Sequence, residues 1–155
     1  MLTQLKRLSI EADGRYASPQ ELQFCDEYFQ SLPLRLSAYQ KLKESADEII
    51  ALTELKMRAI DPKIFINSTG DFTPTWKKDI EQLVRYAAAA LLFNDSDRLN
   101  EGLLIWHSTI AKSYKFDRTC KRTFQVMPEV MREYLSPEEF DLLSPLLSLN
   151  GVVLG

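Results

Sequence analysis

The stretch between Phe72 and Asp95 constrains the fold more strongly than any other part of the chain. Pro74 suits the first turn of a helix, where its missing N–H costs nothing, and Asn94-Asp95 supplies a stop signal. Between them, apolar residues recur at steps of three and four and so share one face of a helix: Trp76, Ile80, Leu83, Ala87 and Leu91. The four alanines at 87–90 allow another helix or a flat ligand to approach closely. The pattern predicts a central core helix.

Start and stop signals predict further helices before this one, and no convincing strand. Ser18-Pro19 with Glu21 is a full helix start, and Pro33 is expected to kink or split the long helix that follows. A further helix opens at 45–48 and ends at Asp61, because the residue before a proline leaves the helical region. Residues 63–73 carry turn chemistry at 67–70 and are predicted to form a loop.

The C-terminal part is also predicted to be helical. One helix is expected over 97–115, and Asp117 can cap the next, in which Pro128 is expected to make a kink. Ser136-Pro137 begins a last helix that Pro145 and Asn150-Gly151 are expected to end. Residues 152–154 are then predicted to be an extended apolar stub.

Composition places the chain among globular proteins and narrows its function. The chain has 155 residues, and 45% of them are apolar. This length and composition predict a single domain, residues 1–155, with its own core. The net charge of −3, with Lys and Arg spread along the chain, argues against nucleic-acid binding. No apolar run approaches the roughly 20 residues of a membrane span, so no membrane insertion is expected. The N-terminus lacks the apolar core of a secretory signal, which predicts a cytoplasmic protein.

Reactive residues are sparse. Cys25 and Cys120 lie far apart without metal-ligand spacing and are interpreted as small buried residues. His107 is the only histidine, and it is interpreted as a partly buried structural residue rather than a haem ligand. The chain shows no nucleophile–histidine signature, phosphate loop or metal-binding motif, so neither an enzyme nor a metal site is predicted.

Three stretches resemble the phycobiliproteins, the family of allophycocyanin and phycocyanin. Residues 75–79, Thr-Trp-Lys-Lys-Asp, followed by Arg85 and Asn94-Asp95, resemble that family's bilin-bearing helix with its Cys-x-Arg-Asp motif, Leu-Arg and Gly-Asp turn. Residues 11–22 resemble its N-terminal hairpin, and the run from 95 to 113 keeps its spacing. The resemblance covers roughly residues 8 to 125 and implies an all-α, globin-like phycobiliprotein fold with an N-terminal helical hairpin over 1–17.

The same resemblance implies a pigment site from which the bilin-attachment cysteine is missing. Trp76 stands at the cysteine position, where it either fills the pocket or stacks on a tetrapyrrole held without a covalent bond. Asp79 would accept hydrogen bonds from pyrrole N–H groups, with Tyr86 on the same helical stripe, or it is a solvated carboxylate near the helix start. Lys78 would pair with a propionate less firmly than the family's arginine, or it is simply solvated. Phe72 is the second aromatic residue able to fill the pocket.

An interface is implied as well. In the resembled family an aspartate of the N-terminal hairpin meets an arginine on the partner subunit's pigment helix, and Asp13 and Arg85 match these positions. Arg85 can instead pair with Glu81 one turn away. The short apolar segment with Leu5 and Leu8, continued to Tyr16, needs a surface on which to dock. We therefore predict a homodimer.

Two functions fit this resemblance. The first is a non-enzymatic globin associated with bilin biosynthesis, which binds or hands over a linear tetrapyrrole alongside haem oxygenase or bilin reductases. A bilin or haem would then be held without a covalent bond. The second is a non-pigmented structural component of a phycobilisome-like light-harvesting antenna, with phycobiliprotein subunits as partners. The sequence does not name the tetrapyrrole or the partners.

Overall fold

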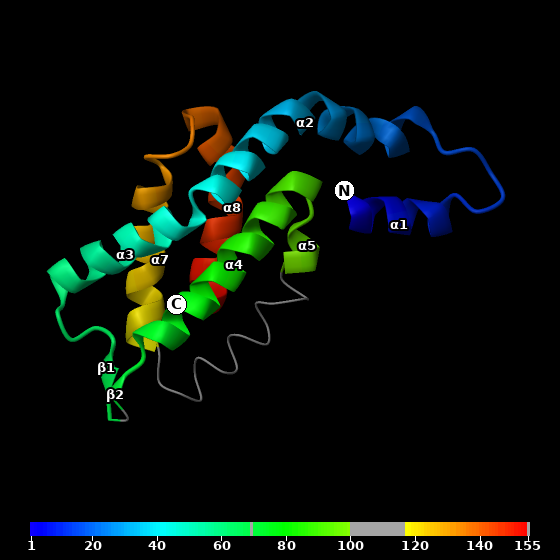
Figure 1. The fold of residues 1–155 in the computed structure, drawn as a ribbon. Coiled ribbons are helices and arrows are strands. Elements are labelled where there is room, and N and C mark those ends of the chain that lie inside the picture. The colour runs from blue at the N-terminus through cyan, green and yellow to red at the C-terminus, as the bar shows by residue number, and fades with distance from the viewer. Residues whose placement is uncertain (69, 100–116, 155) are drawn as a thin grey trace.

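Helices make up most of the computed structural model, which describes residues 1–68, 70–99 and 117–154 (Figure 1). The elements in chain order are α1 (Leu2–Glu11), α2 (Pro19–Glu44), α3 (Ala46–Ile60), β1 (Ile66–Asn67), β2 (Gly70–Asp71), α4 (Thr73–Phe93), α5 (Ser96–Leu99), α7 (Asp117–Met131) and α8 (Pro137–Leu154). The predicted all-α, globin-like class is confirmed. Apart from the turn in α5, the helix predicted over 97–115, with His107, lies outside the described residues.

The central helix α4 is the one predicted from the sequence. Pro74 lies in its first turn, and Asn94 ends it with a φ of 49°, in the left-handed conformation that asparagine tolerates. The whole predicted stripe is buried, as are three of the four alanines: Ala87, Ala88 and Ala90. Helix α4 packs against α2, α3 and α8, so it forms the middle of the core (Figure 1).

Two helices begin with the same reciprocal cap. At the start of α2, the backbone N–H of Glu21 donates to Ser18 Oγ at 3.3 Å, and Glu21 Oε2 accepts from the N–H of Ser18 at 2.7 Å. Ser136 and Glu139 repeat the arrangement at the start of α8. Because Glu139 is 2% exposed and also accepts from Ser37 and Lys41, this second cap ties α8 to α2.

The prolines inside helices do not end them. Pro33 lies within one continuous α2, so the predicted split is wrong, and α7 likewise runs through Pro128 to its end at Met131. Pro145 lies within α8, which continues through Asn150-Gly151 to Leu154, so the predicted helix end and the extended stub are also wrong. Each proline removes one helical hydrogen bond. Buried residues on both sides outweigh that loss by packing on the core: Tyr28 and Arg35 in α2, and Leu143, Leu146 and Leu147 in α8.

The predicted loop before α4 contains a minimal hairpin. Strands β1 and β2 pair antiparallel, with Ile66 opposite Asp71 and Asn67 opposite Gly70. No strand was predicted from the sequence, so this short hairpin is a difference from the prediction. Gly70 has a φ of +119°, which only glycine adopts readily. The hairpin leaves the fold class unchanged, but it brings Phe65 and Phe72 to the same place, where the backbone N–H of Phe72 donates to the carbonyl of Phe65 at 3.0 Å.

The cysteines differ from the prediction. Cys25 and Cys120 are both half-buried rather than buried, and no disulfide joins them. Both lie at helix surfaces rather than in the apolar cluster that fills the centre of the described structure. Neither cysteine belongs to that cluster.

Candidate functional site

The start of α4 is held in place by the loop that precedes it. Asp71 Oδ1 accepts from the backbone N–H of Thr73 at 2.8 Å and from its hydroxyl, and Arg58 Nη2 donates to Thr73 Oγ1 at 2.6 Å. These hydrogen bonds from Thr73 lower the pKa of the Asp71 carboxyl. The first turn of α4, which carries the predicted pigment residues, is therefore fixed relative to α3.

Trp76 lies in the core and has its hydrogen-bonding group satisfied. It is 5% exposed, and its indole Nε1 donates to Thr123 Oγ1 of α7 at 3.0 Å. The same hydroxyl donates to the carbonyl of Thr119 at 2.8 Å, so it accepts from the indole and donates along its own helix. An indole in this setting is fixed both by packing and by a buried hydrogen bond.

Phe65, Phe72 and Trp76 form an aromatic cluster, with Phe65 in contact with both of the other rings. The ring centroids of Phe65 and Trp76 are 4.7 Å apart, and those of Phe65 and Phe72 are 6.1 Å apart at 73°. Phe65 is fully buried at the centre, and the guanidinium of Arg58 lies 4.9 Å from its ring centroid. The rings of Trp76 and Phe72 therefore both pack against Phe65.

Phe65 and Thr123 were not predicted from the sequence as residues of this site. The apolar pair Ile64-Phe65 inside an otherwise polar loop was a signal that this loop returns to the core, because both residues are buried. Thr123 carried no such signal, since a threonine within a helix gives no indication of a partner 47 positions away.

The other three predicted pigment residues lie closer to the surface of α4. Lys78 is exposed, Asp79 is half-buried, and Tyr86 is 39% exposed. Seven residues separate Asp79 from Tyr86, which places them on one face two turns apart, as predicted. The five residues are therefore divided between Trp76 in the core with the half-buried Phe72 beside it, and three residues nearer the surface of the same helix.

Charged residues of α3 and α4 flank the aromatic cluster. Glu54 accepts from Lys77 at 2.7 Å and from Arg58 at 2.8 Å. Burial opposes ionisation of this carboxyl, yet the two cations outweigh it, and the pKa of Glu54 is lowered. Lys77 is therefore engaged, which leaves Lys78 as the lysine at the start of α4 that faces solvent.

The N-terminal helix is attached to the rest of the chain mainly by its first residues. The backbone N–H and the hydroxyl of Thr3 each donate to the Asp95 carboxylate at 2.8 Å, and the amino group of Met1 contacts Asn94 and Asp95. Helix α1 contains no buried residue, and Figure 1 shows it apart from the packed helices, with the chain turning back towards α2. None of its residues belongs to the buried apolar cluster of the described ranges.

The residues predicted for an interface are accessible. Leu5 is 38% exposed, Leu8 is half-buried and Tyr16 is 99% exposed. The Asp13 side chain makes no hydrogen bond or ion pair with the described residues of its own chain. Arg85 is exposed and pairs with Glu81 at 3.2 Å, which is the local alternative considered above. Within one chain, Asp13 and Arg85 do not meet.

The bend between α1 and α2 is held by an exposed ion pair. Arg15 donates to both carboxylate oxygens of Glu21, at 2.7 and 2.9 Å, while Glu21 also completes the cap with Ser18. The hydrogen bond from Arg15, followed by those with Ser18, lowers the pKa of Glu21 to about 2. Arg15 also donates to the carbonyl of Glu11 at 3.3 Å, so its side chain links the end of α1 to the start of α2.

A groove of about 340 Å³ lies beside Arg85, between α4 and the adjoining ends of α2 and α3. Its floor and walls are apolar, with Tyr39, Leu42 and Val84 among them, and its rim carries charges of both signs. The lining residues are Tyr39, Leu42, Lys43, Ala46, Asp47, Glu81, Val84, Arg85 and Ala88. A groove of this size can accept apolar side chains, and the guanidinium of Arg85 at its rim can pair with a carboxylate.

In the described ranges, no cluster of three or more His, Cys, Asp or Glu side chains has the arrangement of a metal site. None of the helices in those ranges has the length and apolar character required to cross a bilayer.

Comparison with protein-family models matches residues 8–149 to the family described as phycobilisome protein. The match extends beyond the part of the chain in which the resemblance was recognised, through α7 and into α8. A search of curated proteins finds no match.

Proposed function

The chain belongs to the phycobilisome protein family, and we propose that within it this protein is a non-enzymatic, phycobiliprotein-like globin that handles a linear tetrapyrrole without a covalent bond. In this proposal the protein acts in bilin biosynthesis, and haem oxygenase or a bilin reductase is the partner that delivers or receives the pigment. The observation that carries this proposal is the burial of Trp76, whose indole is hydrogen-bonded to Thr123 at the position matched to the attachment cysteine.

A tryptophan at this position changes how a pigment can be held. Indole forms no thioether, and here its ring occupies the core beside Phe65, with the half-buried Phe72 packed against Phe65. A tetrapyrrole would therefore lie against the outer side of α4 rather than replace the indole. There, Asp79 would accept from the pyrrole N–H groups, Lys78 would pair with a propionate, and Tyr86 would add an aromatic surface. Haem carries the same propionates and is the second ligand of this class.

Weak, reversible binding fits a protein that passes its ligand on. A lysine contributes a charge without the two-pronged hydrogen bonding of arginine, so the propionate would be held less firmly. A carrier needs a residence time short enough for release to an enzyme, and most affinity differences between related complexes lie in the dissociation rate.

Titration of the purified protein with biliverdin, phycocyanobilin and haem, followed by absorbance, tests the proposal. We expect a saturable spectral change with at least one of them, and complete separation of pigment and protein after denaturation. Asp79→Asn should weaken binding several-fold, whereas Glu129→Gln, an exposed carboxylate on α7, should leave it unchanged. No spectral change with any of the three ligands would eliminate the carrier function.

One observation favours a second function, that of a non-pigmented structural component of a light-harvesting antenna. Helix α1 presents Leu2 and Leu5 to solvent, and the bend that follows it presents Tyr16. A helix of this length is unstable unless it docks on another surface. In this proposal α1 lies on another subunit, Asp13 meets that subunit's arginine at the position of Arg85, and the groove beside Arg85 receives the apolar side chains. The other subunit is a second copy of this chain or a phycobiliprotein subunit.

Association experiments separate the two functions. Sedimentation at micromolar concentration should detect the homodimer, and incubation with antenna subunits should detect a mixed complex. A protein that binds antenna subunits and gives no spectral change with tetrapyrroles is the structural component. A protein that binds a bilin and forms no complex with antenna subunits is the carrier.

A further inference from the structure

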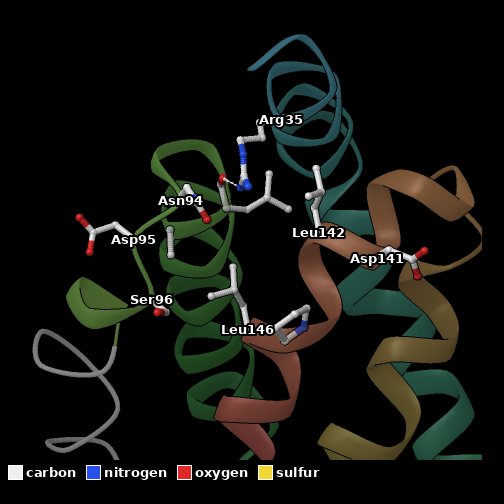
Figure 2. A pocket seen from close by; sticks show the side chains of 10 residues that line it. Arg35, Asn94, Asp95, Ser96, Asp141, Leu142 and Leu146 are labelled. Atoms are coloured by element: carbon white, nitrogen blue, oxygen red, sulfur yellow. Dashed lines mark hydrogen bonds between the residues drawn. The ribbon is translucent and has the colours of Figure 1, made fainter. Parts of the chain in front are cut away.

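A second cavity lies at the opposite end of α4 from Trp76, between the last turn of α4 and α8 (Figure 2). Its volume is about 230 Å³, below the roughly 300–1,000 Å³ typical of sites for drug-sized ligands. Fifteen residues of helix separate Trp76 from Leu91, or about 22 Å at 1.5 Å per residue. The cavity is therefore not part of the aromatic cluster or of the polar group around Asp79.

Arg35 of α2 points into this cavity and is 7% exposed. Its Nε donates to Ser31 Oγ at 2.8 Å, and its Nη1 donates to the carbonyl of Leu91 at 2.7 Å. A guanidinium has five N–H donors, and the residues that the structure describes engage only these two. Burial, as the largest influence, lowers the pKa of Arg35.

No carboxylate in the described ranges forms an ion pair with Arg35. Asp95 and Asp141 line the same cavity, but Figure 2 shows both carboxylates turned away from the guanidinium. Asp95 is held by Thr3 instead. The carbonyl end of α4 offers about half a negative charge, which offsets part of the arginine's charge. A buried cation without a full counter-charge is costly, so the cavity is suited to an anion.

The rest of the lining indicates which anion. The amide of Asn94 and the hydroxyl of Ser96 lie at the cavity wall, and each can donate a hydrogen bond. The opposite wall is apolar, with Leu142, Pro145 and Leu146 from α8. Donors at one end and aliphatic side chains at the other fit a carboxylate on a short hydrocarbon stem. Phosphate fits less well, because the Asp95 and Asp141 carboxylates would repel a dianion more strongly than a monoanion, and because phosphate has no apolar part to lie against the α8 wall.

We propose that this cavity binds a small aliphatic monocarboxylate, whose carboxylate group pairs with the unused N–H donors of Arg35. The planar fork of a guanidinium matches a carboxylate in two parallel hydrogen bonds. Asn94 and Ser96 supply further donors, and the stem lies against Leu142 and Leu146. Because Arg35 also holds Leu91, a ligand here contacts the same residues that join α2 to the end of α4.

Isothermal titration of the full chain with sodium butyrate tests this proposal, with sodium chloride used to match ionic strength. We expect saturable binding at one site. Butyramide, which has nearly the same shape without the charge, should bind at least tenfold more weakly, and so should phosphate. Equal affinity for butyramide, tighter binding of phosphate, or no saturable binding of butyrate would each overturn the assignment.

Variants locate the binding. Leu142→Phe fills the cavity while leaving Arg35 in place, and it should weaken butyrate binding at least tenfold. Asn94→Gly keeps the left-handed backbone and removes one donor, with an expected loss of about threefold. Arg35→Met should abolish binding, and the control Arg7→Met, on the exposed face of α1, should leave it unchanged. If Arg35→Met does not fold, Leu142→Phe decides the question, because unchanged affinity in that variant places any bound butyrate elsewhere.

Discussion

The hydrogen bond between Trp76 and Thr123 can be measured by replacing each residue separately and then both together. Thr123→Val removes the acceptor while keeping almost the same shape, and Trp76→Phe removes the donor together with part of the ring. The double variant removes both hydrogen-bonding groups at once. Comparison of the three variants isolates the interaction, since neither single change reports it alone.

The structure sets the expected magnitudes. In Thr123→Val the indole N–H stays buried without an acceptor, which costs about 1–3 kcal/mol. In Trp76→Phe the hydroxyl of Thr123 keeps its bond to the Thr119 carbonyl, so the loss comes from the emptied volume. That loss should be about 2 kcal/mol, below the roughly 3–5 kcal/mol for removing a whole aromatic side chain. The double variant has no buried indole N–H to leave unpaired, so it should lose about 1–3 kcal/mol less than the sum of the two.

Urea denaturation followed by circular dichroism gives the free energies of unfolding, provided that the slope with urea is the same in all four proteins. Each kcal/mol should also lower Tm by about 2–4 °C for a chain of this length. Two results would refute the reasoning. A loss below about 0.5 kcal/mol in Thr123→Val would mean that the indole N–H is not buried against Thr123, and additive losses would mean that the two side chains do not interact.

Two further predictions concern the acid dependence of stability and the subunit contact. Hydrogen bonds from Lys41 and other donors outweigh the effect of burial and lower the pKa of Glu139 in the folded state. The stability it contributes is therefore present above the unfolded value of about 4.3 and is lost as pH falls through the lower folded value. Glu139→Gln should lower the free energy of unfolding by about 1–3 kcal/mol at pH 7. It should also make the urea midpoint fall less steeply below pH 5, whereas the control Glu129→Gln should behave like the wild type. If the urea midpoint of Glu139→Gln falls with pH as steeply as that of the wild type, the role of Glu139 is refuted. Arg85→Glu should raise the dissociation constant of the dimer at least tenfold in analytical ultracentrifugation, and adding Asp13→Arg should restore it; no restoration would argue that the two residues do not meet.

Much of the helical framework followed from rules that act over a few residues. The cap formed by Ser18 and Glu21, the position of Pro74 and the helix stop at Asn94 were all predicted, because each depends on backbone groups within one turn. The buried stripe of α4 was predicted for the same kind of reason, since a helical period decides which residues share a face.

The prolines show where such rules stop. Pro33 and Pro145 have the same local chemistry as a proline that ends a helix, and the cost of one lost hydrogen bond is real. Whether a helix tolerates that cost depends on what its two halves bury. That information lies in contacts between helices and not in neighbouring residues.

The candidate sites divide in the same way. The sequence alone determined that residue 76 is a tryptophan and that it lies on the buried face of a helix, and with the family resemblance it marked Asp13 and Arg85 as matched residues. The tertiary structure decided that the indole donates to Thr123, that Phe65 fills the space beside it, and that Arg35 is buried at the far end of α4. The physical reason is distance along the chain: periodicity and capping are local, whereas a buried polar group acquires its partner only when segments far apart in sequence pack together.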